Sequence, residues 1–189
     1  KFLETHAIDF MRRNQKNPFV LYVNFLEPHM PYSGPLNDLH DLNALQLPPN
    51  FNDPLEEDEP LRYRLLRQHY IDKRTQEQDM HKENGWRRVL ANYYGLVSQV
   101  DRSVGAILEE LERLGLAEDT IVVYTSDHGD MMGSHKLLAK TVMYEESVKV
   151  PWLMRIPGMG RRQKVLPGRY SHIDLVPTLL DLMGGESNA

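Results

Sequence analysis

The sequence has 189 residues, of which 41% are hydrophobic and 26% charged, and its formal net charge is -5. These values are ordinary for a globular domain, and no basic block of the kind that binds nucleic acid is present. No apolar run approaches the roughly 20 residues that span a bilayer. Cysteine is absent, which excludes disulfides, thiolate metal sites and thiol nucleophiles within this sequence. We therefore expect no nucleic-acid partner and no membrane span.

The chain opens with a predicted helix and a predicted strand. Residues 1–14 are typical of a helix, which Asn17-Pro18 then ends. Residues 19–25, FVLYVNF, form a continuous apolar run rich in β-formers. Such a run indicates a strand that is covered on both faces in a parallel sheet.

A long region of low regularity follows this strand. His29 comes first, in a loop that Pro28 and Pro31 stiffen. Residues 33–60 contain further prolines and are predicted as loop. We interpret residues 40–85 as a polar, solvated insertion that is helical in part.

The second half alternates helices and strands. Apolar residues recur every three or four positions from residue 89 onward and predict one buried stripe on a long helix that closes at Leu114-Gly115. The stripe consists of Val97, Val100, Val104, Ile107, Leu108 and Leu111. Strands are predicted at 120–125 and 150–156, and a last helix at 173–183. This order predicts an α/β fold with a mostly parallel sheet and helices on both faces.

The candidate chemistry follows the predicted strand at 120–125. Asp127 and His128 leave this strand directly, and Gly129 permits a tight turn after them. Ligands of open α/β sheets bind beyond the carboxyl ends of strands, and a carboxylate beside an imidazole can bind a metal ion. Alone, however, Asp-His-Gly is a weak signal that fits a structural loop better than a site.

Lys140 and His29 strengthen the interpretation as a site. Lys140 lies thirteen residues after Asp127, and a lysine near a metal could neutralise an anionic substrate or protonate a leaving group. His29 follows the first predicted strand and is held between prolines. We expect His135 and His172 to be structural instead.

Taken together, these segments resemble the sulfatase family of the alkaline-phosphatase-like superfamily. Five pieces match in order along nearly the whole chain apart from the polar insertion. They are FVLYVNF…PHMPY (19–32), YGLVSQVDRSVG (94–105), TIVVYTSDHGD (120–130), GSH…K…YEES…VP (133–151) and SHIDLVPTLLD (171–181).

The resemblance implies hydrolysis of a sulfate ester of a small molecule or carbohydrate. Sulfatases use a formylglycine, made from Cys or Ser, as a hydrated nucleophile, and a divalent cation, usually Ca²⁺, that holds this group and the sulfate oxygens. Asp127 and His128 would be the later pair of metal ligands. Lys140 would contact the sulfate, and His29 would act from the opposite side as a candidate general acid.

Two parts of the family pattern are absent from this sequence. The nucleophile motif, Cys or Ser-x-Pro-x-Arg, does not occur, nor does the acidic pair that supplies the first metal ligands. We therefore expect residues 1–189 to be part of a single sulfatase-type catalytic domain whose nucleophile lies upstream and whose C-terminal subdomain lies downstream. By themselves these residues are expected to be inactive.

Two other classes of function remain open at this stage. The first is a phosphoesterase of the same superfamily, such as a phosphonate monoester hydrolase or a two-zinc phosphatase, in which His172 could be a further metal ligand. The second is a binding protein that has kept the fold and lost the nucleophile. Lys140 and the Tyr144–Ser147 run fit the single-cation sulfatase pattern better.

Overall fold

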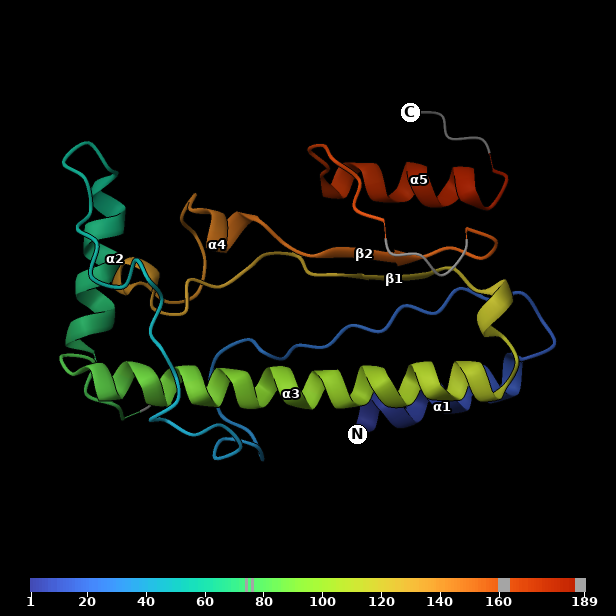
Figure 1. The fold of residues 1–189 in the computed structure, drawn as a ribbon, viewed down its shortest axis with the longest axis horizontal. Coiled ribbons are helices and arrows are strands. Elements are labelled where there is room, and N and C mark those ends of the chain that lie inside the picture. Colours follow the sequence, from blue (N-terminus) through green and yellow to red (C-terminus); the bar gives the residue numbers. More distant parts are fainter. Residues whose placement is uncertain (74, 76, 160–163, 186–189) are drawn as a thin grey trace. The chain divides into compact units, whose positions relative to one another are not determined.

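The computed structural model describes residues 1–73, 75, 77–159 and 164–185. They fall into two compact units, Lys1–Gly158 and Met159–Ala189, which are considered separately. In chain order, the first unit contains α1 (Phe2–Asn14), α2 (Leu61–Asp72), α3 (Glu83–Arg113), η1 (Ala117–Asp119), β1 (Val122–Thr125), η2 (Ser134–Lys136), α4 (Glu145–Val148) and β2 (Trp152–Arg155) (Figure 1). The second contains η3 (His172–Asp174) and α5 (Leu175–Leu182).

The predicted N-terminal helix is present as α1, which packs along the C-terminal part of α3 (Figure 1). Two polar contacts join the helices. Arg12 donates to Glu110 at 2.7 Å, and the Ser103 hydroxyl donates to Glu4 at 2.9 Å. The pair forms one wall of the first unit.

The long helix α3 begins earlier than the sequence pattern predicted. It includes Gly85, which lies so close to Asp79 that a Cβ atom would sit 2.3 Å from the Asp79 carbonyl oxygen. The glycine therefore allows the backbone at Asp79 to approach the helix closely and does not mark a turn. The predicted C-terminal end is confirmed, with Gly115 at a φ of 72° just beyond the helix.

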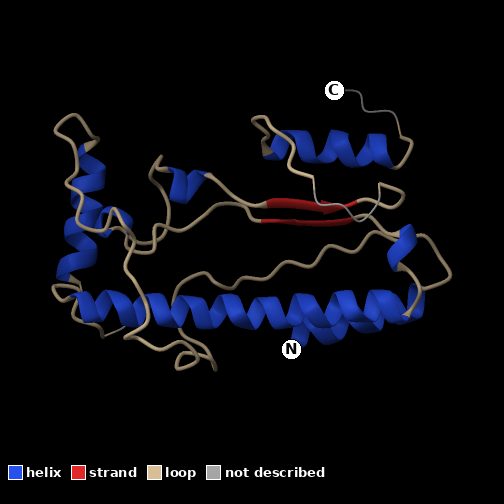
Figure 2. Ribbon diagram, viewed as in Figure 1, coloured by secondary structure: helices blue, strands red, loops and turns tan. Residues whose placement is uncertain are grey.

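β1 and β2 confirm the two predicted strands of the second half but pair antiparallel (Figure 2). Val122 lies opposite Arg155, and Thr125 lies opposite Trp152. The intervening chain contains only short helices and folds back on itself, which brings the returning strand in beside the outgoing one. Parallel pairing needs a crossover that this segment does not make. The predicted parallel sheet is therefore not confirmed by these strands.

Residues 19–26 run in an extended conformation without a β-ladder in the part of the chain that the structure describes. Exposure alternates along the segment: Val20 and Tyr22 are each 83% exposed, whereas Leu21 and Val23 are partly buried. This alternation has the period of a strand. The predicted burial of both faces is not observed, because only one face packs against described residues.

The core lies around the N-terminal half of α3 and draws on the region interpreted as a solvated insertion. Two clusters of buried side chains form it, one of Tyr32, Phe51, Met80, Trp86, Val89, Leu96 and Leu138, and one of Tyr63, Met131, Leu137 and Val142. Phe51, Tyr63 and Met80 all come from residues 40–85. Sparse apolar residues in this polar stretch thus converge in space, and the region is not wholly solvated.

In the second unit, α5 confirms the predicted last helix, preceded by the short η3. Ser171 and Asp174 form a capping box, in which the Ser171 N–H donates to Asp174 at 2.7 Å. The two residues thus cap the start of this helix together. No helix among the described residues combines the length and apolarity needed to cross a bilayer.

Candidate functional site

The turn that follows β1 brings Asp127 and His128 together. The Nε2 atom of His128 lies 3.4 Å from Oδ2 of Asp127. On the other side of the ring, Nδ1 lies 2.7 Å from the carbonyl oxygen of Gly129. A carbonyl oxygen only accepts, so Nδ1 carries the hydrogen and Nε2, which faces the carboxylate, is the nitrogen that can bind a metal when the ring is neutral. Metal-ligating histidines commonly have this arrangement.

The spacing of these two donors suits a single cation. Two donors that each lie about 2.4 Å from an ion and subtend a right angle are about 3.4 Å apart. The Asp127 carboxylate is 84% exposed and therefore accessible. Its partial burial tends to raise the pKa of Asp127, but the N–H and the ring of His128 hold it below its ordinary value. In the described part of the chain, no third His, Cys, Asp or Glu completes a metal cluster.

Gly129 fixes the position of this turn against the chain that leads into β2. Its N–H donates to the Ser147 carbonyl at 2.8 Å. A Cβ atom at residue 129 would lie 2.0 Å from the carbonyl oxygen of Glu146. Any residue other than glycine at position 129 would therefore require one of the two backbone segments to shift. The Tyr144–Ser147 run thus supports the turn through its backbone.

Lys140 lies in a loop whose backbone takes several left-handed conformations. The residues on either side of it, Ala139 and Thr141, have φ angles of 59° and 81°. Such values are rare for residues with a Cβ, above all for a β-branched threonine. Lys140 is partly buried and forms no hydrogen bond or ion pair within the part of the chain that the structure describes. Its ammonium group is therefore available to an anionic ligand.

His29 is exposed in the loop that follows residues 19–26. Its Nδ1 atom lies 2.7 Å from the Met30 carbonyl oxygen, so Nδ1 carries a hydrogen here as well. The peptide bonds that precede Pro28 and Pro31 are both cis. This loop and the one that carries Lys140 are joined by a hydrogen bond of 2.8 Å between Tyr32 and Asp130, which end two of the sequence motifs but had been given no role.

The two other histidines have different surroundings. His135 stacks on the Tyr144 ring, with centroids 4.3 Å apart and an angle of 14° between the planes. This is the packing role that the sequence led us to expect. His172 belongs to η3 in the second unit.

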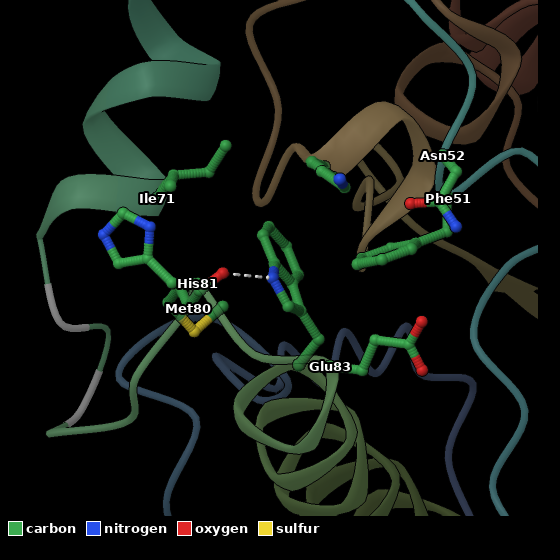
Figure 3. A pocket seen from close by; sticks show the side chains of 8 residues that line it. Phe51, Asn52, Ile71, Met80, His81 and Glu83 are labelled. Atoms are coloured by element: carbon green, nitrogen blue, oxygen red, sulfur yellow. Dashed lines mark hydrogen bonds between the residues drawn. The ribbon is translucent and has the colours of Figure 1, made fainter.

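A separate cavity of about 340 Å³ lies beside the N-terminal end of α3 (Figure 3). Its lining comprises Phe51, Asn52, Ile71, Met80, His81, Glu83, Trp86 and Lys136. The Trp86 indole donates to the Met80 carbonyl at 2.8 Å, as the dashed line in Figure 3 shows. None of the four predicted site residues lines this cavity, which the long region before α3 largely forms.

The sulfatase family model matches residues 2–185 of the chain. The chain is 32% identical to an arylsulfatase of Clostridium perfringens over 93% of its own length and 36% of that enzyme. It is 28% identical to the multifunctional alkaline phosphatase superfamily protein PehA of Trinickia caryophylli, covering 98% of this chain and 38% of that protein. The structure of the phosphonate monoester hydrolase SpPMH from Silicibacter pomeroyi matches with a TM-score of 0.77 and 26% identity, over 97% of this chain and 38% of that one.

These matches define a partial α/β domain of the alkaline-phosphatase-like type. The chain belongs to the sulfatase family, as its sequence motifs had indicated. It spans little more than a third of the length of the relatives that it matches.

Proposed function

We propose that these residues are part of the catalytic domain of a metal-dependent sulfatase, which hydrolyses a sulfate monoester of a small molecule or carbohydrate. The observation that carries this proposal is the pairing of Asp127 and His128 at the end of β1. Their donor atoms lie 3.4 Å apart, and the backbone of Gly129 fixes the tautomer of the imidazole. Membership of the sulfatase family supports the same assignment.

Asp127 and His128 would hold one side of a divalent cation, with Ca²⁺ as the expected ion. An oxygen and a nitrogen donor together suit several hard or borderline cations. When bound, such an ion stabilises negative charge on the sulfate oxygens and on the nucleophile. The remaining ligands and the formylglycine nucleophile would come from parts of the enzyme outside these 189 residues.

Lys140 and His29 would act on the oxygen that leaves the sulfur atom. Cleavage of a sulfate ester builds negative charge on this bridging oxygen, and a donor placed there stabilises the transition state more than the ground state. The Lys140 ammonium forms no hydrogen bond or close ion pair among the described residues, although its charge interacts with the Asp130 carboxylate. In His29, Nδ1 already donates to the Met30 carbonyl, so Nε2 can donate a proton only from the doubly protonated ring.

The same proposal covers the architecture of the complete domain. The strand-like residues 19–25 and β1 would lie in a mostly parallel sheet with helices on both faces, within a single catalytic domain that carries an insertion at about residues 40–85. The alternating exposure of residues 19–26 supports this, because the exposed apolar face of Val20 and Tyr22 is suited to cover by further protein.

A phosphonate monoester hydrolase is the second candidate. The TM-score of 0.77 to SpPMH and the similarity to the protein PehA favour it. The two functions share the cation and the charged donors, so Asp127, His128, Lys140 and His29 suit either function.

We would separate the two functions by measuring kcat/KM of the full-length, metal-loaded enzyme on p-nitrophenyl sulfate and on p-nitrophenyl phenylphosphonate. A preference for the sulfate supports the main proposal; a preference for the phosphonate supports the alternative; no turnover of either supports a binding protein.

The Asp127→Asn variant of the full-length protein tests the metal assignment directly. We expect its calcium affinity to fall by more than about tenfold, because a neutral amide oxygen replaces an anionic ligand. The measurement is isothermal titration calorimetry on the chelator-treated protein. Asp119→Asn is the matched control, since this exposed carboxylate precedes β1 instead of following it. An unchanged calcium affinity in Asp127→Asn would refute the assignment.

A further inference from the structure

The carboxylate of Asp130 accepts hydrogen bonds from two separate loops. Its Oδ2 atom accepts from the Tyr32 hydroxyl at 2.8 Å. Its Oδ1 atom accepts from the backbone N–H groups of Ala139 at 2.8 Å and Met132 at 3.1 Å. Charge-assisted bonds to a shielded carboxylate are stronger and more directional than bonds between neutral groups. Asp130 therefore ties residue 32 to residue 139 at one point.

Both bonded positions are next to residues that the proposed function uses. Tyr32 lies three residues after His29 in the same loop, and Ala139 directly precedes Lys140. Tyr32 is completely buried, so its ring anchors that loop in the core around Trp86. A shift of Asp130 would be passed to both loops together.

The loop that contains Lys140 depends on contacts that hold its backbone in place. Positive φ angles occur at Met132, His135, Lys136, Ala139 and Thr141. Conformations of this kind persist only where surrounding contacts over-determine them. Two such contacts lie within the loop itself, from the Met131 N–H to the Ala139 carbonyl at 2.8 Å and from the Gly133 N–H to the Leu137 carbonyl at 2.9 Å. Asp130 adds the bond that lies nearest to Lys140.

Asp130 achieves this without a close ion pair to Lys140, whose charge interacts with the carboxylate only at longer range. Its oxygens accept from a phenol and from backbone amides, and no ion pair with Lys140 forms among the described residues. The carboxylate thus fixes the backbone beside Lys140 while the ammonium group stays available for an anionic substrate.

We propose that Asp130, through its bond to Tyr32, is a positioning residue that sets the place of Lys140 relative to His29 at the leaving-group oxygen. This inference rests on the proposed function. It concerns residues that touch neither substrate nor metal and act through the two loops that they join. Because a misplacement of about 1 Å at a reacting centre can cost about 100-fold in rate, breaking the bond should affect the chemical step more than binding.

The test uses Tyr32→Phe in the full-length, metal-loaded enzyme, with Tyr93→Phe as the matched control. Tyr93 packs edge-on against Tyr32 in the same cluster, with ring centroids 5.8 Å apart, but among the described residues it donates no hydrogen bond to Asp130. We expect kcat of Tyr32→Phe to fall about 10- to 100-fold with KM changed less than threefold. The loss should be larger for an alkyl sulfate than for p-nitrophenyl sulfate, because the poorer leaving group depends more on its proton donor.

A second pair of variants and a readout independent of activity complete the test. Asp130→Asn keeps an oxygen for the amides of Ala139 and Met132, so it should retain more activity than Asp130→Ala. Amide hydrogen exchange across residues 131–141 should be faster in Tyr32→Phe than in the wild type. Unchanged exchange together with an unchanged leaving-group dependence would overturn the positioning role and leave the sulfatase proposal intact. A wild-type enzyme inactive on both ester classes would overturn the proposed function, and the positioning role with it.

Discussion

At the residue scale, the two histidines of the candidate site make the same hydrogen bond to their own backbone. In His29 and His128 alike, Nδ1 donates to the carbonyl oxygen of the next residue at 2.7 Å. Each ring is thereby held by its own backbone and presents Nε2 outward. The Nε2 atoms then differ in use. That of His128 faces a carboxylate and suits a metal, whereas that of His29 belongs to an exposed side chain and can donate a proton once the ring is doubly protonated.

Truncation of the proposed donors should affect rate far more than stability. For Lys140→Ala and His29→Ala we expect kcat on an aryl sulfate to fall about 100- to 1000-fold, as for the loss of one donor at a developing charge. The melting temperature should change little, because neither side chain belongs to the buried core. Lys149→Ala, which removes a lysine that is 76% exposed, is the control. Turnover equal to wild type in either variant would show that the residue has another role.

Sequence reasoning reached the candidate site residues through their places next to strands, because Asp127, His128 and Lys140 lie close together along the chain. It missed the contact between Tyr32 and Asp130, which are 98 positions apart and meet only in the folded protein. Nothing in the local sequence around a tyrosine in a proline-rich loop, or around an acid after Asp-His-Gly, indicates that the two residues pair. Their link became visible only through the hydrogen bond.

At the scale of elements, the sequence pattern located helices more reliably than it assigned their faces. α1 and α5 lie where it predicted them and α3 ends where predicted but begins earlier, and the expected stripe on α3 is only partly buried. Leu111 is 4% exposed, whereas Val97 is 41% exposed. Periodicity identifies the apolar face of a helix, but whether that face is covered depends on what packs there.

Two glycines of α3 provide a matched test of the packing on this helix. A Cβ atom at Gly95 would lie 2.4 Å from the Leu36 carbonyl oxygen, whereas one at Gly105 would meet nothing within 4 Å. We expect Gly95→Ala to lower the free energy of unfolding by about 1–3 kcal/mol through overpacking. Gly105→Ala should raise it by up to about 1 kcal/mol through helix propensity. Urea unfolding measures both, and equal effects would contradict the close approach of residue 36 to α3.

At the scale of the whole molecule, the contact between α1 and α3 joins the start of the chain to its middle. Glu110, with an 8% exposed side chain, accepts from Arg12 and Arg113. Hydrogen bonds from Arg113 and Arg12 lower the pKa of Glu110 to about 2. An unfolded glutamate titrates near about 4.3. The stabilisation that this depressed pKa provides is therefore complete above about pH 5 and is lost as the pH falls toward 2.

Glu110→Gln should therefore flatten the acid limb of the stability profile. We expect the variant to be less stable than the wild type at pH 7 and the difference to shrink between about pH 5 and 2. The measurement is urea unfolding over this range, with Glu109→Gln as the control because Glu109 is the exposed neighbour on α3. A difference that stayed constant with pH would mean that the two arginines do not stabilise the charged form.

The family and the α/β class could be predicted from the sequence, because short motifs near strand ends carry both. The strand pairing could not, since it depends on how the chain returns through residues 126–151. The burial of Phe51 and Met80 was equally hidden, because isolated apolar residues in a polar stretch reveal nothing of their partners. Both failures concern contacts between segments that local sequence does not encode.

The left-handed loop before Lys140 also has a consequence for inactivation by heat. Its conformation is held by hydrogen bonds within the loop and by Asp130, which Tyr32 connects to the core, and local backbone preference opposes it. Segments of this kind open at a lower free energy than the helices around them. The enzyme should therefore lose activity on warming while most of its helical structure is still intact. The activity should return on cooling as long as the core has not unfolded.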